Sequence, residues 1–400
     1  MRLRLVLLAL AGICILTACG GSTSSQTPLV TQHNKVIPAA LLEGSSGGDW
    51  PMFGYDPGHT GYADALVESH VLAGKLAWSQ KFGPIFSSAV AGLGMVYIAS
   101  TDGYLYALDQ TSGAIVWRVN IGIYLTDATP ALEGQALFVS VHSSTIEALN
   151  ARTGSVYWTF AMAEKIQAPP LVVGSHVLVA SRTTLWSLNA TSGQLLWKFH
   201  RGAVSWPTTG VPAVAGSTVY IGLGSGTQFW ALDLSSGQAL WAFDTGDRIT
   251  STALVAANIV YVATWHGTLF ALDRVHGTKL WSYSLNGKTN QSVVDGVGGS
   301  MALADGKLYV GDYRGEVICL DAQHGKLIWR FATGAQVLAT PVIAAGLVYV
   351  GSDDGYFYAL NTRTGRPAWR YATGEVRSSA SLASGHLYVG SLDGTMYAFS

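Results

Sequence analysis

Short runs of alternating hydrophobic and polar residues cover most of the chain after residue 64. The run 96–106 reads Val-Tyr-Ile-Ala-Ser-Thr-Asp-Gly-Tyr-Leu-Tyr, and residues 348–358 and 387–397 repeat its pattern. β-Branched and aromatic residues on either side of an Asp-Gly turn predict two antiparallel strands. A run of small and apolar residues, such as 88–91, precedes each pair and predicts a third strand, which is narrow enough to lie nearest a central axis.

An eleven-residue phrase after each pair predicts a fourth strand. It reads small residue, Leu, Asp or Asn, three turn residues, Gly, three residues, Trp, and its first copy spans residues 107–117. The Asx and Gly positions are typical of a tight turn, because the Asx side chain bonds its own backbone and Gly accepts a positive φ. Complete copies end at Trp117, Trp158, Trp197, Trp241, Trp281, Trp329 and Trp369, and a shorter one ends at Trp78.

The eight tryptophans recur every 39 to 48 residues, a period typical of propeller blades. A four-stranded sheet cannot bury both faces alone, so successive repeats must stack. The last repeat stops at Ser400 without its phrase, and residues 74–78 supply the missing part. We therefore predict an all-β, eight-bladed β-propeller of four-stranded antiparallel blades in residues 64–400. Its last blade is closed by the N-terminal strand, which removes the free sheet edge.

The N-terminus resembles a bacterial lipoprotein signal. Residues 1–4 are basic, residues 5–16 are apolar but short for a membrane span, and Leu16-Thr17-Ala18-Cys19 follows. We expect residues 1–18 to be the signal peptide and Cys19 the lipidation site; the alternative is a secretory signal cut near Ala18. Residues 19–48 are expected to form a flexible tether. The mature protein would be extracytoplasmic and membrane-anchored, on the periplasmic side of a diderm outer membrane or the outer face of a monoderm cytoplasmic membrane.

Composition narrows the classes of function. The chain has 23 Lys and Arg against 24 Asp and Glu, which gives no reason to expect nucleic acid as a partner. The histidines form no pair at metal-binding spacing. Cys319 takes a position held by small residues in other repeats, which predicts a buried thiol. We expect no catalytic residue and no bound metal.

A second motif makes a family resemblance specific. Residues 49–63 contain Trp-Pro-x-Phe-x-x-Asp-x-x-His-Thr-Gly, from Trp50 to Gly61, and we expect them to form a latch packed over the ring. With the Trp phrases, this opening resembles the pyrroloquinoline-quinone-repeat (PQQ-like) propeller family over residues 49–400. The resemblance implies two alternatives. One is a quinoprotein dehydrogenase with PQQ and Ca²⁺, and the other is the non-enzymatic lipoprotein branch that includes the outer-membrane β-barrel assembly factor BamB.

The residues favour the second alternative. The dehydrogenase resemblance implies a pair of adjacent cysteines, which this chain lacks. Calcium needs about six to eight converging oxygens, and the only acidic doublet, Asp353-Asp354, lies in a predicted turn. We therefore expect a binding or scaffold module without a cofactor, with PQQ and calcium only under the dehydrogenase alternative. The BamB-like branch carries Leu-x-Leu-Arg where this chain has residues 203–206, so the assembly role stays open.

One face of the ring is the predicted binding site. In a propeller, the loops that enter the innermost strands and the turns between the second and third strands share one face, at the channel mouth. Exposed aromatic and Arg side chains there are of the kinds that anchor interfaces. We expect a monomeric ring whose rim docks an envelope protein or polymer. The predicted rim residues are Tyr124, Asp127, Lys165, Trp206, Arg248, Trp265, His266, Lys288, Asp295, Arg314, Gln336 and Arg377.

Overall fold

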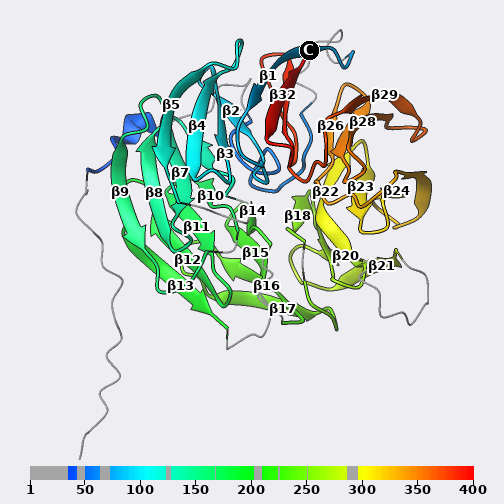
Figure 1. Ribbon diagram of the computed structural model, residues 1–400. Helices are drawn as coiled ribbons and strands as arrows, with labels where there is room; N and C mark the ends of the chain where they lie inside the picture. The colour runs from blue at the N-terminus through cyan, green and yellow to red at the C-terminus, as the bar shows by residue number, and fades with distance from the viewer. Residues whose placement is uncertain are drawn as a thin grey trace, which may run out of the picture.

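The computed structural model describes residues 35–42, 50–63, 73–122, 128–166, 168–201, 210–223, 226–249, 251–285 and 296–400. These residues form eight four-stranded antiparallel sheets arranged as a ring (Figure 1). The predicted eight-bladed propeller is confirmed. One 3₁₀ helix, η1 (Ala39–Leu41), precedes the strands, and no helix in the described part of the chain is long and apolar enough to cross a bilayer.

Each blade has the same strand order from the axis outward, and blades are numbered here from the one that begins with β2. The innermost strands are β2 (Val90–Gly92), β6 (Ala131–Glu133), β10 (Leu171–Val173), β14 (Ala213–Ala215), β18 (Leu254–Ala256), β22 (Val297–Ala304), β26 (Val342–Ala344) and β30 (Ser381–Ala383). The second strands are β3 (Met95–Ala99), β7 (Ala136–Val141), β11 (His176–Ala180), β15 (Thr218–Gly222), β19 (Ile259–Ala263), β23 (Lys307–Asp312), β27 (Leu347–Gly351) and β31 (His386–Gly390).

The outer half of each blade carries the Trp phrase. The third strands are β4 (Tyr104–Asp109), β8 (Thr145–Asn150), β12 (Thr184–Asn189), β16 (Gln228–Asp233), β20 (Thr268–Asp273), β24 (Glu316–Asp321), β28 (Tyr356–Asn361) and β32 (Thr395–Phe399). The outermost strands are β5 (Ile115–Asn120), β9 (Val156–Ala161), β13 (Leu195–His200), β17 (Ala239–Asp244), β21 (Lys279–Ser284), β25 (Leu327–Ala332), β29 (Pro367–Ala372) and β1 (Leu76–Lys81).

The phrase tryptophan joins each blade to the next. Trp158 packs on Gly193 of the following blade, where a Cβ atom would lie 2.6 Å from the indole and where φ is +71°. The Trp158 Nε1 donates a hydrogen bond to the carbonyl of Ala190, 3.0 Å away. The Trp-Gly contact recurs around the ring from Trp78 on Gly113 to Trp369 on Gly74. The Trp and Gly of the phrase therefore recur together because they form one inter-blade contact.

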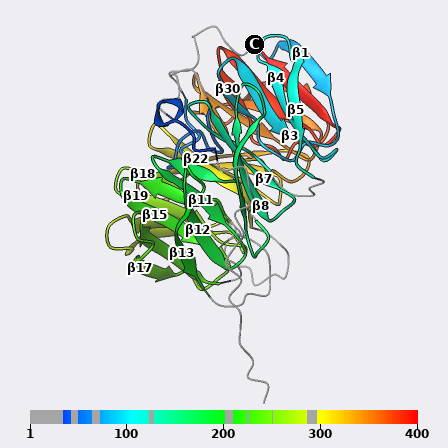
Figure 2. The same cartoon turned by 90° about the vertical axis from the view of Figure 1, so that its left-hand side faces the viewer.

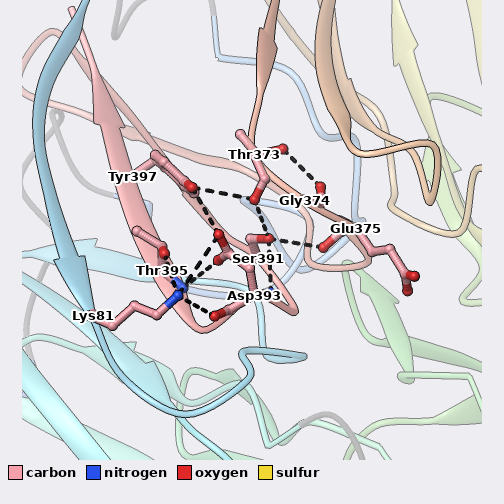
Figure 3. A network of polar contacts seen from close by, with 8 residues as sticks. All are labelled: Lys81, Thr373, Gly374, Glu375, Ser391, Asp393, Thr395 and Tyr397. Carbon is pink, nitrogen blue, oxygen red and sulfur yellow. Dashed lines mark hydrogen bonds and ion pairs between the residues drawn. The ribbon is translucent and has the colours of Figure 1, made fainter.

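Strand β1 closes the ring at blade 8. It pairs antiparallel with β32, with Ser79 opposite Tyr397 and Lys81 opposite Thr395. The Lys81 Nζ donates to the Thr395 hydroxyl at 3.3 Å and to the carbonyl of Asp393, while the Tyr397 hydroxyl donates to an Asp393 carboxylate oxygen at 3.1 Å (Figure 3). The predicted closure of the last blade by the N-terminal strand is confirmed, and β32 is paired on both sides.

A chain of hydroxyl groups around the axis also links the blades. Each hydroxyl accepts a hydrogen bond from the backbone N–H of the preceding blade. Such bonds run from Val211 to Thr252, Thr252 to Ser300, Ser300 to Thr340, Thr340 to Ser379, Ser379 to Ser88, and Ser88 to Thr129, at 2.8 to 3.2 Å. Blade 3 has Pro169-Pro170 at this position, and proline has neither a backbone N–H nor a hydroxyl to contribute.

The segment 50–63 lies inside the channel (blue in Figure 1). Its backbone bonds the innermost strands of six blades: Trp50 with Ala91, Pro51 with Leu132, Pro57 with Val214, Gly58 with Val255, Thr60 with Leu303 and Gly61 with Ile343. We expected this segment to pack over the ring, whereas in the structure it lies within the channel. The physical reason is that the inner edges of these short strands carry backbone groups that need partners.

Candidate binding face

Backbone hydrogen bonds fasten the loops of the predicted rim to one another. In blade 5, the N–H of Trp265, in the turn after β19, donates to the carbonyl of Arg248, in the loop that enters β18, at 2.8 Å. In blade 7, Asp353 N–H donates to the carbonyl of Gln336 at 2.9 Å. Because loop and turn of one blade are joined in this way, their side chains emerge on a common face.

Aromatic contacts connect the rim of blade 5 with that of blade 6. The Arg248 guanidinium lies over the Trp265 ring, 5.2 Å from its centroid. The Trp265 ring meets Tyr313 of blade 6 edge to face at 5.9 Å between centroids. The first contact is a favourable cation–π geometry, and the second is a favourable geometry for two aromatic rings. These side chains form a preorganised surface on which each ring is partly exposed.

Arg377 extends this row toward blades 7 and 8. Its guanidinium makes a bidentate ion pair with Asp353, with N···O distances from 2.9 to 3.2 Å, and lies 3.8 Å from Glu375. The Asp353 carboxylate raises the pKa of Arg377. Burial raises the pKa of the Tyr313 hydroxyl, and the positive charge of Arg377 opposes that rise. The row Arg248, Trp265, Tyr313 and Arg377, called the rim row below, thus spans blades 5 to 8.

A hydrogen-bonded pair, His266 and Asp247, holds the blade 5 turn. The His266 ring Nδ1 lies 2.9 Å from Asp247 Oδ1, and the His266 N–H donates to Oδ2 at 2.9 Å. Burial alone would raise the pKa of Asp247, but the bonds from His266 and from the Arg248 N–H keep it below its ordinary value. Asp247 therefore stays ionised near neutral pH and fixes the backbone beneath Arg248 and Trp265.

Other predicted residues lie apart from the rim row. Lys165 belongs to blade 3, where it lines a cavity of about 320 Å³ with Glu164, Arg182 and Thr183. Burial alone would raise the pKa of Glu164. The hydrogen bonds from Ser181, Thr183 and Thr184 outweigh burial, so the pKa lies below its ordinary value. Arg314 and Gln336 are exposed near the row in blades 6 and 7. Tyr124, Asp127, Trp206, Lys288 and Asp295 lie outside the described residues, as does Cys19.

Sequence reasoning missed a buried acid beside the rim row. Asp312 ends β23 and is 1% exposed. Its Oδ1 accepts from the N–H groups of Arg314 and Glu316 at 3.0 and 2.7 Å, while its Oδ2 has no hydrogen-bond partner among the described residues. Burial raises the pKa of Asp312 to about 6. The signal in the sequence was an Asp where blades 7 and 8 have Ser352 and Ser391.

The side chains that could hold a metal or a quinone are scattered over the described residues. Across the described ranges, no three His, Cys, Asp or Glu side chains come together as a metal site. Cys319 is buried and unpaired, and burial raises the pKa of its thiol to about 12. Neither observation supplies the adjacent cysteines or oxygen cage that the dehydrogenase resemblance implies. The expectation that no cofactor binds stays a prediction.

The blade repeat, the Trp-Gly contact and the channel segment define a PQQ-like repeat propeller. A family model described as outer membrane protein assembly factor BamB matches residues 60–122, 101–242, 186–296 and 266–400. The chain belongs to this family.

Individual relatives match about half of the chain. BamB of Moranella endobia (strain PCIT) is 27% identical over 226 residues, which cover 50% of this chain and 58% of the relative. BamB of Yersinia pestis is 26% identical over 223 residues, covering 50% and 56%. Tetrathionate hydrolase of Acidithiobacillus ferrooxidans is 26% identical over 215 residues, covering 53% and 39%. The chain thus spans less than two thirds of the length of these relatives.

Solved structures agree on the fold. BamB of Moraxella catarrhalis superposes with a TM-score of 0.67 and 22% identity, covering 82% of this chain and 97% of that structure. Quinohemoprotein alcohol dehydrogenase of Comamonas testosteroni superposes with a TM-score of 0.76 and 16% identity, covering 90% and 83%. At these identities the likeness shows the ring architecture, which enzymes and binding proteins share.

Proposed function

We propose that this protein is a non-catalytic binding or scaffold module of the cell envelope that docks a partner protein on its rim. The observation that carries the proposal is the rim row, in which Arg248, Trp265, Tyr313 and Arg377 reach from blade 5 to blade 8 on one face. The family match supports it, because relatives named as outer membrane protein assembly factors share the repeat. A role in outer-membrane β-barrel assembly is the finer form of this proposal.

The chemistry of the rim row suits a protein surface. Trp, Tyr and Arg dominate the residues whose loss costs most at interfaces. Their side chains are already held by ring contacts and by the ion pair between Arg377 and Asp353, so binding would cost little further ordering. Arg248 and Arg377 flank the aromatic pair, and Asp353 and Glu375 balance the charge of Arg377, so the row favours a partner segment with an apolar anchor rather than a strongly charged one.

The deciding experiment pairs two surface variants. Arg248→Ala with Trp265→Ala should weaken capture of the partner in a crosslinking pull-down from envelope extract by at least about thirtyfold, which corresponds to about 2 kcal/mol. Val275→Ala with Lys326→Ala, exposed positions on the opposite face, is the matched control and should leave capture unchanged. Both variants should melt as the parent does. Equal recovery by the parent and the rim variant would refute the rim as the docking face.

We further propose that Cys19 carries the lipid anchor, as its place after Leu16-Thr17-Ala18 suggests. The protein would then be an extracytoplasmic, membrane-anchored lipoprotein. Cys19→Ser should move the protein from the membrane fraction to the soluble fraction of the envelope. Membrane association that survives this change and is resistant to high salt would contradict the anchor.

A redox enzyme is the alternative function, because a tetrathionate hydrolase matches part of the sequence and a quinohemoprotein alcohol dehydrogenase shares the ring architecture. If the binding proposal is right, purified protein mixed with PQQ and Ca²⁺ should lose the quinone absorbance on gel filtration and should not reduce a dye with alcohols or glucose. Retention of the quinone with turnover above background would establish the dehydrogenase alternative instead.

A further inference from the structure

Exposed aliphatic side chains gather on the face opposite the rim. In each blade the Trp phrase turns there from the third strand into the outermost strand, and this face is called the phrase face below. Among the described residues, all but one of the large hydrophobic side chains that are exposed lie in these phrases. They are Ile115, Val116, Leu195, Leu196, Leu240, Val275, Leu280, Leu327 and Ile328, which are 40% to 63% exposed.

The propeller fold does not require aliphatic residues at these positions. Blade 7 has Arg-Pro-Ala at residues 366–368, before Trp369, and its outermost strand β29 still pairs with β28. Aliphatic residues on an exposed sheet edge favour aggregation, and natural edge strands usually carry charged residues or proline instead. A set of exposed aliphatic residues confined to one face is therefore typical of an interaction surface.

Positive charge accompanies the aliphatic residues in blades 5 to 7. The phrases of these blades carry five basic residues: Arg274, Lys279, Lys326, Arg363 and Arg366. They carry two carboxylates, Asp273 and Asp321, and each accepts hydrogen bonds from N–H groups of its own turn at 2.7 to 3.0 Å. Asp305 and Lys307, in the adjoining turn between β22 and β23, balance each other. This part of the phrase face therefore has an excess of positive charge.

The N-terminal segment is fixed to the same face. Residues 35–42, which include η1, lie at the edge of the ring (blue in Figure 2). Lys35 N–H donates to the carbonyl of Tyr157, at the start of β9, at 3.0 Å. Ile37 N–H donates to the carbonyl of Thr191, in the blade 3 phrase, at 2.9 Å. The chain therefore enters the described part of the molecule at the phrase face.

This attachment orients the ring if Cys19 carries a lipid. Lys35 follows Cys19 by 16 positions, and a flexible coil of that length spans about 20 Å. Val36, the one exposed aliphatic residue outside the phrases, is 63% exposed beside this attachment. A lipid on Cys19 would therefore hold the phrase face, and not the rim, close to the bilayer.

We propose that the phrase face docks on the surface of an anionic lipid bilayer. The aliphatic side chains at the start of the outermost strands enter the headgroup region, and the basic residues of blades 5 to 7 lie beside lipid phosphates. Burial of apolar area and attraction to anionic lipids are the two contributions to such binding, and this face supplies both. The proposal deepens the proposed membrane anchoring and rests on it, because the lipid on Cys19 brings this face to the bilayer.

The distribution of the aliphatic residues favours a bilayer over a protein as the occupant. They are spread over blades 1, 3, 4, 5 and 6 and are not gathered in one pocket. A protein interface has its strongest contacts clustered at its centre, whereas a bilayer meets a whole face of the ring at once. The rim row is then directed away from the membrane, where a partner can reach it.

The test uses residues 19–400 with Cys19→Ser, which retain every described residue and lack both the apolar segment 1–18 and the lipid site. Flotation with vesicles of phosphatidylcholine containing about 30% phosphatidylglycerol should carry the protein upward at low salt, and pure phosphatidylcholine should carry much less. Lys326→Glu with Arg366→Glu should lower the partition coefficient at least about tenfold, because each basic residue near an anionic surface contributes about fivefold. Leu280→Ser with Leu327→Ser should lower it at least about fivefold.

The matched control is Lys165→Glu with Arg182→Glu, two exposed residues on the rim side of blade 3. It makes the same change in net charge and should stay within about twofold of the parent. Equal losses by the two charge reversals would mean that net charge alone attracts the protein, and would overturn the proposal. All of these positions are exposed, so the variants should fold.

A dye that reports its surroundings locates the bound face. Leu327→Cys carries it on the phrase face and Arg182→Cys on the rim side, and Cys319 is buried and should not react. Emission should move to shorter wavelength on anionic vesicles for the first variant only. Absence of vesicle binding, or a dimer of the parent that Leu327→Ser dissociates without any dye response to vesicles, would overturn the proposal. Neither result would concern the lipid anchor, which is tested separately by fractionation of Cys19→Ser cells.

Discussion

Asp312 shows how one residue can depart from a repeat and change the physics of its blade. In blades 7 and 8 the same position holds Ser352 and Ser391, whose hydroxyls donate to carbonyls of the entering loop, for example Ser391 to Thr373 at 2.6 Å. An ionised carboxylate cannot donate, and Oδ2 of Asp312 is buried without a partner among the described residues. Burial of a charge without compensation is costly, which is why the pKa of Asp312 is raised.

The sign of the resulting pH dependence follows from that shift. The folded pKa of about 6 lies above the ordinary value of 3.8, so the folded state favours the neutral acid, and stability falls as pH rises through about 6. Asp312→Ser should therefore raise the free energy of unfolding by about 3 kcal/mol at pH 8 and by about half as much at pH 5. Guanidinium unfolding at both pH values measures this. A gain that is equal at pH 5 and pH 8 would show that Asp312 is not the titrating group.

At the scale of strands, the sequence predicted the features that recur in every blade, and it did not predict contacts between side chains that lie far apart along the chain. Alternation and Asx-Gly turns sufficed for the strands, and the Trp phrase sufficed for blade order. The partners Asp353 of Arg377 and Asp247 of His266 were not predicted, because turn carboxylates look alike along a sequence. The small residues at the start of each innermost strand predicted a narrow strand. Their hydrogen-bonded chain was not predicted, because each hydroxyl bonds a residue one whole repeat away.

Thr340 tests the hydroxyl chain. Thr340→Val keeps the shape of the side chain but leaves the buried N–H of Ser300 without its acceptor, now 2.9 Å away. An unsatisfied buried donor costs about 1–3 kcal/mol, so the midpoint of guanidinium unfolding should fall accordingly. Thr278→Val, at an exposed turn position, is the control and should stay within about 0.5 kcal/mol of the parent. Equal stability of the two variants would mean that the axial hydroxyls do not link the blades.

The whole molecule depends on contacts between its two ends. Repeat counting predicted the closure of blade 8 because the phrase is missing at the C-terminus and present at residues 74–78. The sequence did not predict that the segment 50–63 lies within the channel, since nothing in a single repeat indicates that the inner strand edges need partners. The bonds from this segment to six innermost strands depend on all those blades being present, and only the closed ring brings them together.

A disulfide across the closing strands measures what this closure contributes. Lys81→Cys with Thr395→Cys, which are paired between β1 and β32, would close a loop between positions 314 residues apart. Thr268→Cys with Ser284→Cys is the same pair of positions within blade 5, where it closes only a hairpin. Because the loop entropy removed from the unfolded chain grows with the logarithm of loop length, oxidation should stabilise the first variant by about 2–3 kcal/mol more than the second. Guanidinium unfolding with and without reductant, in a Cys19→Ser background, gives both values. If the thiols at 81 and 395 stay free in oxidant, or if the two gains are equal, then the N-terminal strand does not seal the ring in solution.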